Sequence, residues 1–308
     1  MARYILGRLA QALVALWVVV TVTFVLMHAV PGDPFASLKT PAAVRQLLQA
    51  RYGLDLPLPR QYLIYLGNVA RGRLGWSLLD PQRTVGGIIR AGLPVSAELG
   101  AEALVWSLGL GVALGLAAAL RPTGAWGWAT AAASLLGLAL PNFVLAVLSD
   151  YVFAVRAAAL PVAGWGSPAQ SVLPALALGA LPLALVARMT AAQAAEVLAA
   201  DHVRAARAKG LTWAQVLRRH VLRNALLPVL TLLGPLVAAT LTGSFVIESV
   251  FGVPGLGSAF VSSILDRDYP LILGLTIFYA ALLLLLHLLV DLAYGAADPR
   301  VRLAARGG

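Results

Sequence analysis

Apolar residues run through this chain in six long stretches, separated by polar connections. The stretches cover residues 9–30, 103–120, 130–149, 171–187, 225–247 and 271–290. About 20 apolar residues in a helix cross the roughly 30 Å of hydrocarbon in a bilayer. The pattern therefore predicts an all-α polytopic membrane protein with six transmembrane helices. We expect the first stretch to be a retained anchor, because it is longer than the apolar core of a secretion signal and has no clear cleavage site.

The long connection 31–102 contains two helical patterns. Thr40-Pro41 is typical of a helix start, and this helix should end at Gly53. A second helix is predicted over 59–72, with its apolar residues on one face. Two interpretations stay open: a helical pair that lies on the outer leaflet, or a docking surface for an external partner.

Prolines and glycines interrupt the apolar stretches and predict bent, closely packed helices. The prolines are Pro141, Pro174, Pro182, Pro228 and Pro235, and the glycines are Gly109, Gly111, Gly115, Gly179, Gly234 and Gly243.

Basic residues predict the orientation of the spans. They gather before the first stretch, between the fourth and fifth stretches and after the sixth, and these regions share one face when the number of spans is even. Positive charge marks the cytoplasmic side, so we expect both termini in the cytoplasm of a multi-pass protein of the inner membrane. The net charge of +10 follows this distribution, and we expect no nucleic-acid partner.

Composition excludes several classes of protein. Apolar residues make up 60% of the chain and charged residues 12%, whereas about a quarter of an average soluble protein is charged. The chain has no cysteine, which excludes disulfides and thiolate chemistry. It has no phosphate-binding loop with a lysine, so we expect it to bind no cofactor itself, and we expect no metal site.

The connection 191–228 combines basic residues with helix-ending signals. A helix is predicted to continue from the fourth span to Lys209, and Gly210 can end it in the left-handed conformation. Thr212 and Gln215 fit a capping box that starts a second helix over 213–227. One interpretation, which involves no partner protein, is a positively charged anchor at the membrane. Small residues (Ala205, Ala206 and Ala208) favour instead a surface that another backbone approaches closely.

This connection resembles the coupling loop of ABC importer permeases of the peptide/nickel branch, which includes the dipeptide and oligopeptide permeases. Ala205-Ala206 and Gly210 match the loop's paired alanines and glycine, and Arg219-His220 with 223–228 (R-N-A-L-L-P) match the residues that follow. Further resemblances come in the family's order, at 30–34 (V-P-G-D-P), 52–55 (Y-G-L-D), 140–143 (L-P-N-F), 173–176 (L-P-A-L), 248–257 (E-S-V-F…P-G-L-G), 267–270 (R-D-Y-P) and 291–300 (D-L-A-Y…D-P-R). Three positions depart from it: His202, Arg73 and His287.

The resemblance implies a type I importer permease that carries peptides. Its expected partners are a second homologous permease subunit in a heterodimer, two ATPase subunits or domains that use ATP and Mg²⁺, and an external binding protein. It implies an N-terminal anchor with an external helical segment over 1–93, and a five-span core over 94–308. The coupling residues would be Asp201, Arg204, Ala205, Ala206, Arg207, Lys209, Gly210 and Leu211.

Polar residues in or beside the spans are candidates for the transport path or gate. Glu248 and Asp291 rank first because they fall inside the matched motifs, and Ser244 and Asn142 are further candidates. We expect Arg267 and Asp268 to form a local ion pair.

Other functions stay open. The same machinery would serve for nickel chelates or another small solute. An intramembrane hydrolase would need a pair such as Asp150 with Asp291, or Ser244 with His28 or His287. A transporter that works without an ATPase is a third class.

Overall fold

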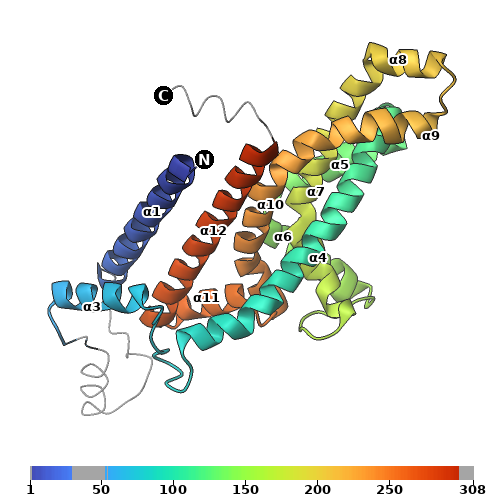
Figure 1. Ribbon diagram of the computed structural model, residues 1–308. Helices are drawn as coiled ribbons and strands as arrows, with labels where there is room; N and C mark the ends of the chain where they lie inside the picture. The colour runs from blue at the N-terminus through green and yellow to red at the C-terminus, as the bar shows by residue number, and fades with distance from the viewer. Residues whose placement is uncertain (1, 30–52, 54, 298–308) are drawn as a thin grey trace. The chain divides into compact units, whose positions relative to one another are not determined.

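The computed structural model describes residues 2–29, 53 and 55–297, which are built from helices (Figure 1). The side chains of 2–5, 227, 242, 243 and 290–297 are outside this description. The chain divides into two compact units. Unit 1 is Met1–Pro94 with Gly255–Gly308, and unit 2 is Val95–Pro254. The predicted division into 1–93 and 94–308 stays a prediction.

Unit 1 contains a pair of long apolar helices that pack together, α1 and α12. Its elements are α1 (Ala2–Ala29), α3 (Leu58–Ala70), the first part of α4 (Val85–Leu120), α11 (Leu256–Leu265) and α12 (Tyr269–Ala297). The prediction of a helix over 59–72 is confirmed by α3, which ends before Gly72 at φ +69°. The predicted helix from Thr40 lies outside the described residues.

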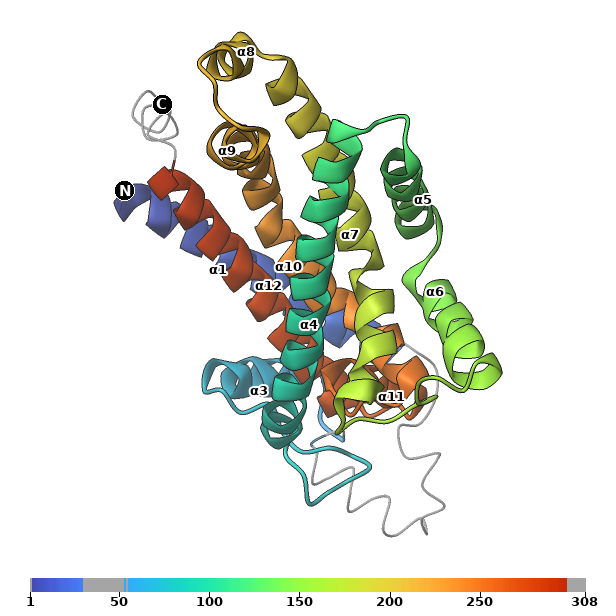
Figure 2. The same cartoon turned by 90° about the vertical axis from the view of Figure 1, so that its right-hand side faces the viewer.

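Unit 2 is arranged around α7, which packs against α5, α6 and α10 (Figure 2). Its elements are the rest of α4, α5 (Ala125–Ala139), α6 (Asn142–Ser149), the π-helix η1 (Asp150–Arg156), α7 (Pro168–Ala199), α8 (Asp201–Ala208), α9 (Trp213–Val216), the π-helix η2 (Leu217–Val221) and α10 (Leu222–Phe251). Its largest buried side chains include Leu99, Leu173 and Phe251, which share one apolar cluster.

Glycines let the helices of unit 2 approach one another closely. A Cβ atom on Gly115 would lie 2.5 Å from the Ala187 carbonyl oxygen, and one on Gly179 would lie 2.6 Å from the Trp106 ring. Gly137, which the sequence did not single out, meets Ala184 at 2.8 Å in the same way. Gly109 has nothing within 4 Å, so the prediction of close packing is wrong at that position.

Four helices in the described residues are long and apolar enough to cross a membrane, and the number rises to seven if each of three bent helix pairs counts as one span. Every predicted apolar stretch falls on α1, α4, α5 with α6, α7, α10 or α12. The predicted bend at Pro141 is confirmed, since the helices on either side meet at 114°. Leu140 is extended at ψ 130°, as expected for a residue before proline. Pro174 and Pro182 lie inside α7 without ending it.

Candidate functional site

The basic connection between α7 and α10 begins with a break at Ala200. This residue is extended at ψ 147°, so α7 ends at Ala199 and α8 starts afresh at Asp201. The Ala200 carbonyl accepts the N–H groups of Val203 and Arg204, which closes the first turn of α8. The prediction of one continuous helix to Lys209 is therefore wrong.

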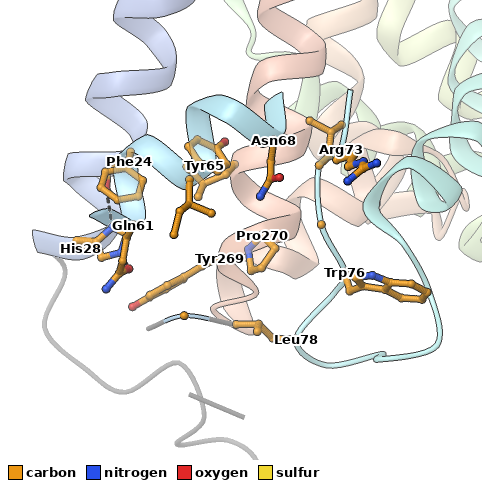
Figure 3. A pocket seen from close by; sticks show the side chains of 15 residues that line it. Phe24, His28, Gln61, Tyr65, Asn68, Arg73, Trp76, Leu78, Tyr269 and Pro270 are labelled. Atoms are coloured by element: carbon orange, nitrogen blue, oxygen red, sulfur yellow. Dashed lines mark hydrogen bonds between the residues drawn. The ribbon is translucent and has the colours of Figure 1, made fainter. Parts of the chain in front are cut away.

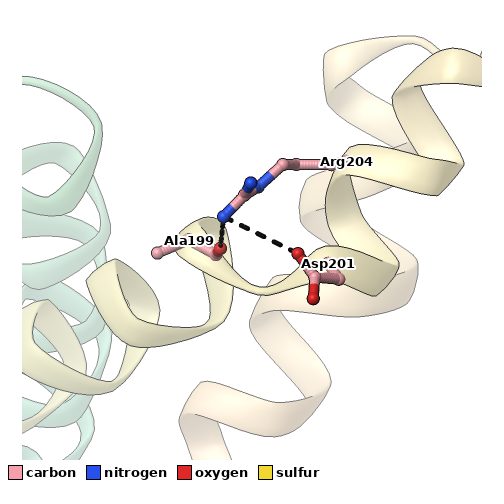
Figure 4. Close-up of polar contacts among 3 residues, drawn as sticks. All are labelled: Ala199, Asp201 and Arg204. Atoms are coloured by element: carbon pink, nitrogen blue, oxygen red, sulfur yellow. Dashed lines mark hydrogen bonds and ion pairs between the residues drawn. The ribbon is translucent and has the colours of Figure 1, made fainter.

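Arg204 and Asp201 stabilise this break (Figure 4). The Arg204 guanidinium donates to the Ala199 carbonyl at 3.0 Å, which satisfies one of the free carbonyls at the end of α7. The same guanidinium lies 3.7 Å from the exposed Asp201 carboxylate. A carboxylate in the first turn also favours the N-terminus of α8. The break is held by side chains that reach back across it.

Gly210 ends α8 in the way the sequence predicted. Its φ is +85°, and two hydrogen bonds complete a Schellman motif: Gly210 N–H to the Arg207 carbonyl at 2.9 Å, and Leu211 N–H to the Ala206 carbonyl at 3.3 Å. The Arg207 side chain also donates to the Leu211 carbonyl at 3.0 Å. The turn is therefore fixed by both backbone and side-chain contacts.

The predicted capping box follows at once and is confirmed. Thr212 N–H donates to Gln215 Oε1 at 2.9 Å, and Gln215 N–H donates to Thr212 Oγ1 at 3.4 Å. Arg207 lies over the Trp213 ring at 4.5 Å, which ties α8 to α9. The helical path then continues through η2 into α10, with a bend of 48° near Pro228.

Helix α8 has one buried face and one exposed face. Val203 and Ala206 pack in a cluster with Val216, Val221 and Ala225. Ala206 is therefore part of the chain's own core, and the reason for expecting a partner to approach it is wrong. The exposed residues of α8 and its turn are Asp201, His202, Arg204, Ala205, Arg207, Ala208, Lys209 and Gly210, while Leu211 is half-buried.

The candidate path residues lie on more than one helix of the structure. Glu248 is fully buried on α10, and Ser96 on α4 donates to its Oε1 atom at 2.8 Å. Ser244, one turn earlier on α10, is buried with its hydroxyl bonded to the Leu241 carbonyl. Asn142 is half-buried in the first turn of α6. The side chain of Asp291 lies outside the described residues.

Ser96 is a residue that the sequence analysis missed. Serine in an apolar stretch carries little signal, because its hydroxyl can bond to its own helix backbone. Its role as a hydrogen-bond donor to Glu248 depends on the approach of α4 to α10 in the folded chain.

Asp268 is another buried carboxylate, at the start of α12. It accepts hydrogen bonds from the Ser77 hydroxyl and from the N–H groups of Leu78 and Leu271. These contacts hold the segment 77–78 against the N-terminal end of α12. The predicted ion pair with Arg267 stays a prediction.

Metal chemistry gains no support within the described part of the chain. No group of three or more His, Asp or Glu side chains is placed there to hold a metal ion.

The sequence matches two family profiles that between them cover most of the chain. The profile described as "Binding-protein-dependent transport system inner membrane component" matches residues 111–303. The profile "Binding-prot-dependent transport system membrane comp, N-term" matches residues 1–79.

Individual relatives are similar along their whole length. The dipeptide transport system permease protein DppB of Bacillus subtilis is 46% identical over 308 residues, which is 100% of both chains. DppB of Lactococcus lactis is 40% identical over 98% of this chain and 100% of the relative. The oligopeptide transport system permease protein OppB of Haemophilus influenzae is 39% identical, with the same coverage.

Proposed function

Because the chain belongs to the family of binding-protein-dependent transport system inner membrane components, we propose that it is a permease subunit of an ATP-driven peptide importer. The proposal of a peptide cargo is supported by the relatives, which are named for dipeptide and oligopeptide transport. Nickel chelates and other small solutes are the rival cargoes.

The energy for transport comes, in this proposal, from separate ATPase subunits that bind ATP and Mg²⁺. The chain itself has no phosphate-binding loop with a lysine. The coupling surface is the exposed face of α8, and the observation that carries this assignment is the construction of α8. It is a short helix with defined contacts at both ends and an exposed, basic outer face.

Motion would pass from α8 to the spans through its buried face. Val203 and Ala206 share a cluster with residues of α7, η2 and α10, and packed interiors transmit displacement because they have little free space. A pull on α8 when the ATPase dimer closes would therefore move α7 and α10 with it. Glu248 would act as a brace that keeps α4 joined to α10 through Ser96.

The remaining parts of the importer follow the same proposal. A second, similar permease subunit would complete the path, with both termini of this chain in the cytoplasm. The segment 31–102 would then face the external binding protein. The basic connections support this orientation.

Two neighbouring alanines on α8 allow a matched test of the coupling surface. Ala205 is exposed, whereas Ala206 is 8% exposed and lies inside the cluster. In the full chain, Ala205→Leu should leave the melting temperature unchanged and reduce co-purification of the ATPase at least tenfold, because the larger side chain blocks close approach. Ala206→Leu should lower the free energy of unfolding by about 1–3 kcal/mol through overpacking.

The two variants separate the proposal from its rival, a simple membrane anchor. A membrane anchor needs only positive charge. If α8 is such an anchor, the Ala205→Leu variant should still co-purify with the ATPase and show normal uptake. That result would refute the assignment of α8 as the coupling surface.

A further inference from the structure

A cavity of about 520 Å³ lies within unit 1 (Figure 3). Its walls come from the end of α1, from α3, from the segment 73–78 and from the first turns of α12. This volume is in the range of small-molecule sites. Its position is at the ends of two membrane-spanning helices, on the face that we propose to be external.

Aromatic rings form much of the wall. Phe24 stacks near His28 and Tyr65, with ring centroids 4.2 and 5.8 Å away, and His28 lies 6.4 Å from Tyr269. Helix α3 is held to α1 by a hydrogen bond of 2.6 Å between the Tyr62 and Thr21 hydroxyl groups. Trp and Tyr side chains gather at the level of lipid headgroups, and Tyr65, Trp76 and Tyr269 in the lining fit a cavity at that depth.

The charge at the cavity is positive. Among the described residues that line it, Arg73 is the only Arg, Lys, Asp or Glu. The turn after α3 fixes its position, because the Asn68 carbonyl accepts the N–H groups of both Arg71 and Arg73, and Gly72 has φ +69°. Figure 3 shows the Asn68 amide pointing toward Pro270, where it can serve as a second polar contact. Arg73 is one of the three positions at which this chain departs from the peptide-permease pattern, which commonly has aspartate there, so the chain carries the opposite charge.

His28 adds to this polarity. Its Nδ1 atom faces the Phe24 carbonyl at 2.8 Å and its Nε2 atom faces Gln61 Oε1 at 3.1 Å. Gln61 is oriented by its own donation to the Leu56 carbonyl at 2.8 Å. The imidazole ring therefore faces two carbonyl oxygens, one from the backbone and one from an amide side chain. Burial also raises the pKa of the Tyr65 hydroxyl, so no negative charge forms there at physiological pH.

The rim of the cavity is apolar. Ile64 and Trp76 line it and are 52% and 45% exposed. Leu63 on α3 and Val25 and Leu26 on α1 are not among the lining residues, but they are more than half exposed on the same two helices. Arg73 is exposed as well, so a bound molecule meets a positive charge beside apolar side chains at the same opening, which suits a phosphate that carries acyl chains.

We propose that this cavity binds the headgroup of an anionic glycerophospholipid, with the phosphate near Arg73 and Asn68 and the acyl chains against the exposed apolar residues of α1 and α3. The shared chemistry is an organophosphate. The apolar rim favours a lipid as its source over a free molecule.

Native mass spectrometry of the full chain, purified with its co-expressed partner subunits, tests this site. The probes are phosphatidylglycerol and phosphatidylcholine with identical acyl chains. Both lipids carry a phosphate, but the choline cation of phosphatidylcholine is repelled by Arg73, so the unaltered chain should retain phosphatidylglycerol about tenfold better than phosphatidylcholine. Arg73→Asp should abolish that preference.

Arg71→Asp is the matched control. Arg71 is exposed, donates to the Gly67 carbonyl and does not line the cavity, so the same change of charge there should leave the preference intact. Ile64→Ser, which keeps the charge, should weaken retention of both lipids by reducing contact with the acyl chains.

Three results would overturn the proposal: equal retention of the two lipids by the unaltered chain, an unchanged preference in Arg73→Asp, or a loss of preference in Arg71→Asp as large as in Arg73→Asp. A further arm uses glycerol 3-phosphate. If it binds as tightly as phosphatidylglycerol and with the same dependence on Arg73, the ligand is a free organophosphate and the lipid assignment is wrong.

Discussion

At the scale of single residues, Gly210 joins α8 to the helix that follows, and its backbone conformation is what matters. A Cβ atom there would meet nothing within 4 Å, so substitution acts through φ and through the N–H group. Gly210→Pro cannot adopt φ +85° and removes the donor to the Arg207 carbonyl. We expect normal membrane insertion with loss of ATP-driven uptake.

Gly210→Ala is the control for that experiment. Alanine keeps the N–H group and pays only the strain of a left-handed residue, about 1–2 kcal/mol. Uptake measured in intact cells should be reduced but not abolished. Normal uptake by the proline variant would show that the turn is not needed for coupling.

Residue-level prediction succeeded where the signal is local. Gly210 and the Thr212–Gln215 box are short-range patterns with fixed geometry, and both form as expected. The bond between Ser96 and Glu248 joins positions 152 residues apart. No local pattern could identify that pair, because it depends on how α4 meets α10.

At the scale of helices, the close contact between α5 and α7 depends on a glycine. A Cβ atom on Gly137 would lie 2.8 Å from the Ala184 Cβ atom and would press on the Ala180 carbonyl. We expect Gly137→Ala to lower the free energy of unfolding by about 1–3 kcal/mol, because the helices must separate.

Gly109 on α4 provides the comparison. With nothing within 4 Å of its Cβ position, Gly109→Ala should stabilise the chain by up to about 1 kcal/mol through helix propensity. Thermal unfolding of both variants in the same detergent measures the difference. Similar effects of the two substitutions would mean that the glycine contact is not tight.

A comparison of two helix ends shows why one could be predicted from the sequence and the other could not. The bend at Pro141 follows from proline chemistry and was expected. The break at Ala200 was not, because alanine is the best helix former and the sequence 196–204 has no proline or glycine. The chain breaks there because Arg204 reaches back to the Ala199 carbonyl and α8 buries Val203 and Ala206. Tertiary packing overrides propensity at this point.

At the scale of the whole molecule, the family could be predicted because many short motifs occur in one order along the chain. Each motif alone is weak, and the resemblance to peptide permeases was confirmed by relatives that match over the full length. The cargo is harder to predict from single residues, since the peptide assignment comes from the names of the relatives.

Gentle purification of the chain from its own membrane, followed by mass spectrometry, tests the assembly. We expect a second permease chain, ATPase subunits and a binding protein that carries peptide. A nickel chelate on the binding protein would support the rival cargo. A stable assembly without any ATPase would contradict the proposed energy source.

The two faces of α8 are subject to different constraints: packing within this chain on one face, and the proposed contact with a partner on the other. Its buried side is committed to the fold of this chain, and Asp201, Arg204 and Arg207 hold the ends of the helix, whereas the exposed positions 205 and 208 carry only small side chains on the outer face. Partner choice could therefore drift in evolution without repacking the protein. An engineer could exploit the same separation, because exchanging only those two side chains would alter the surface offered to the motor without disturbing the core or the helix ends.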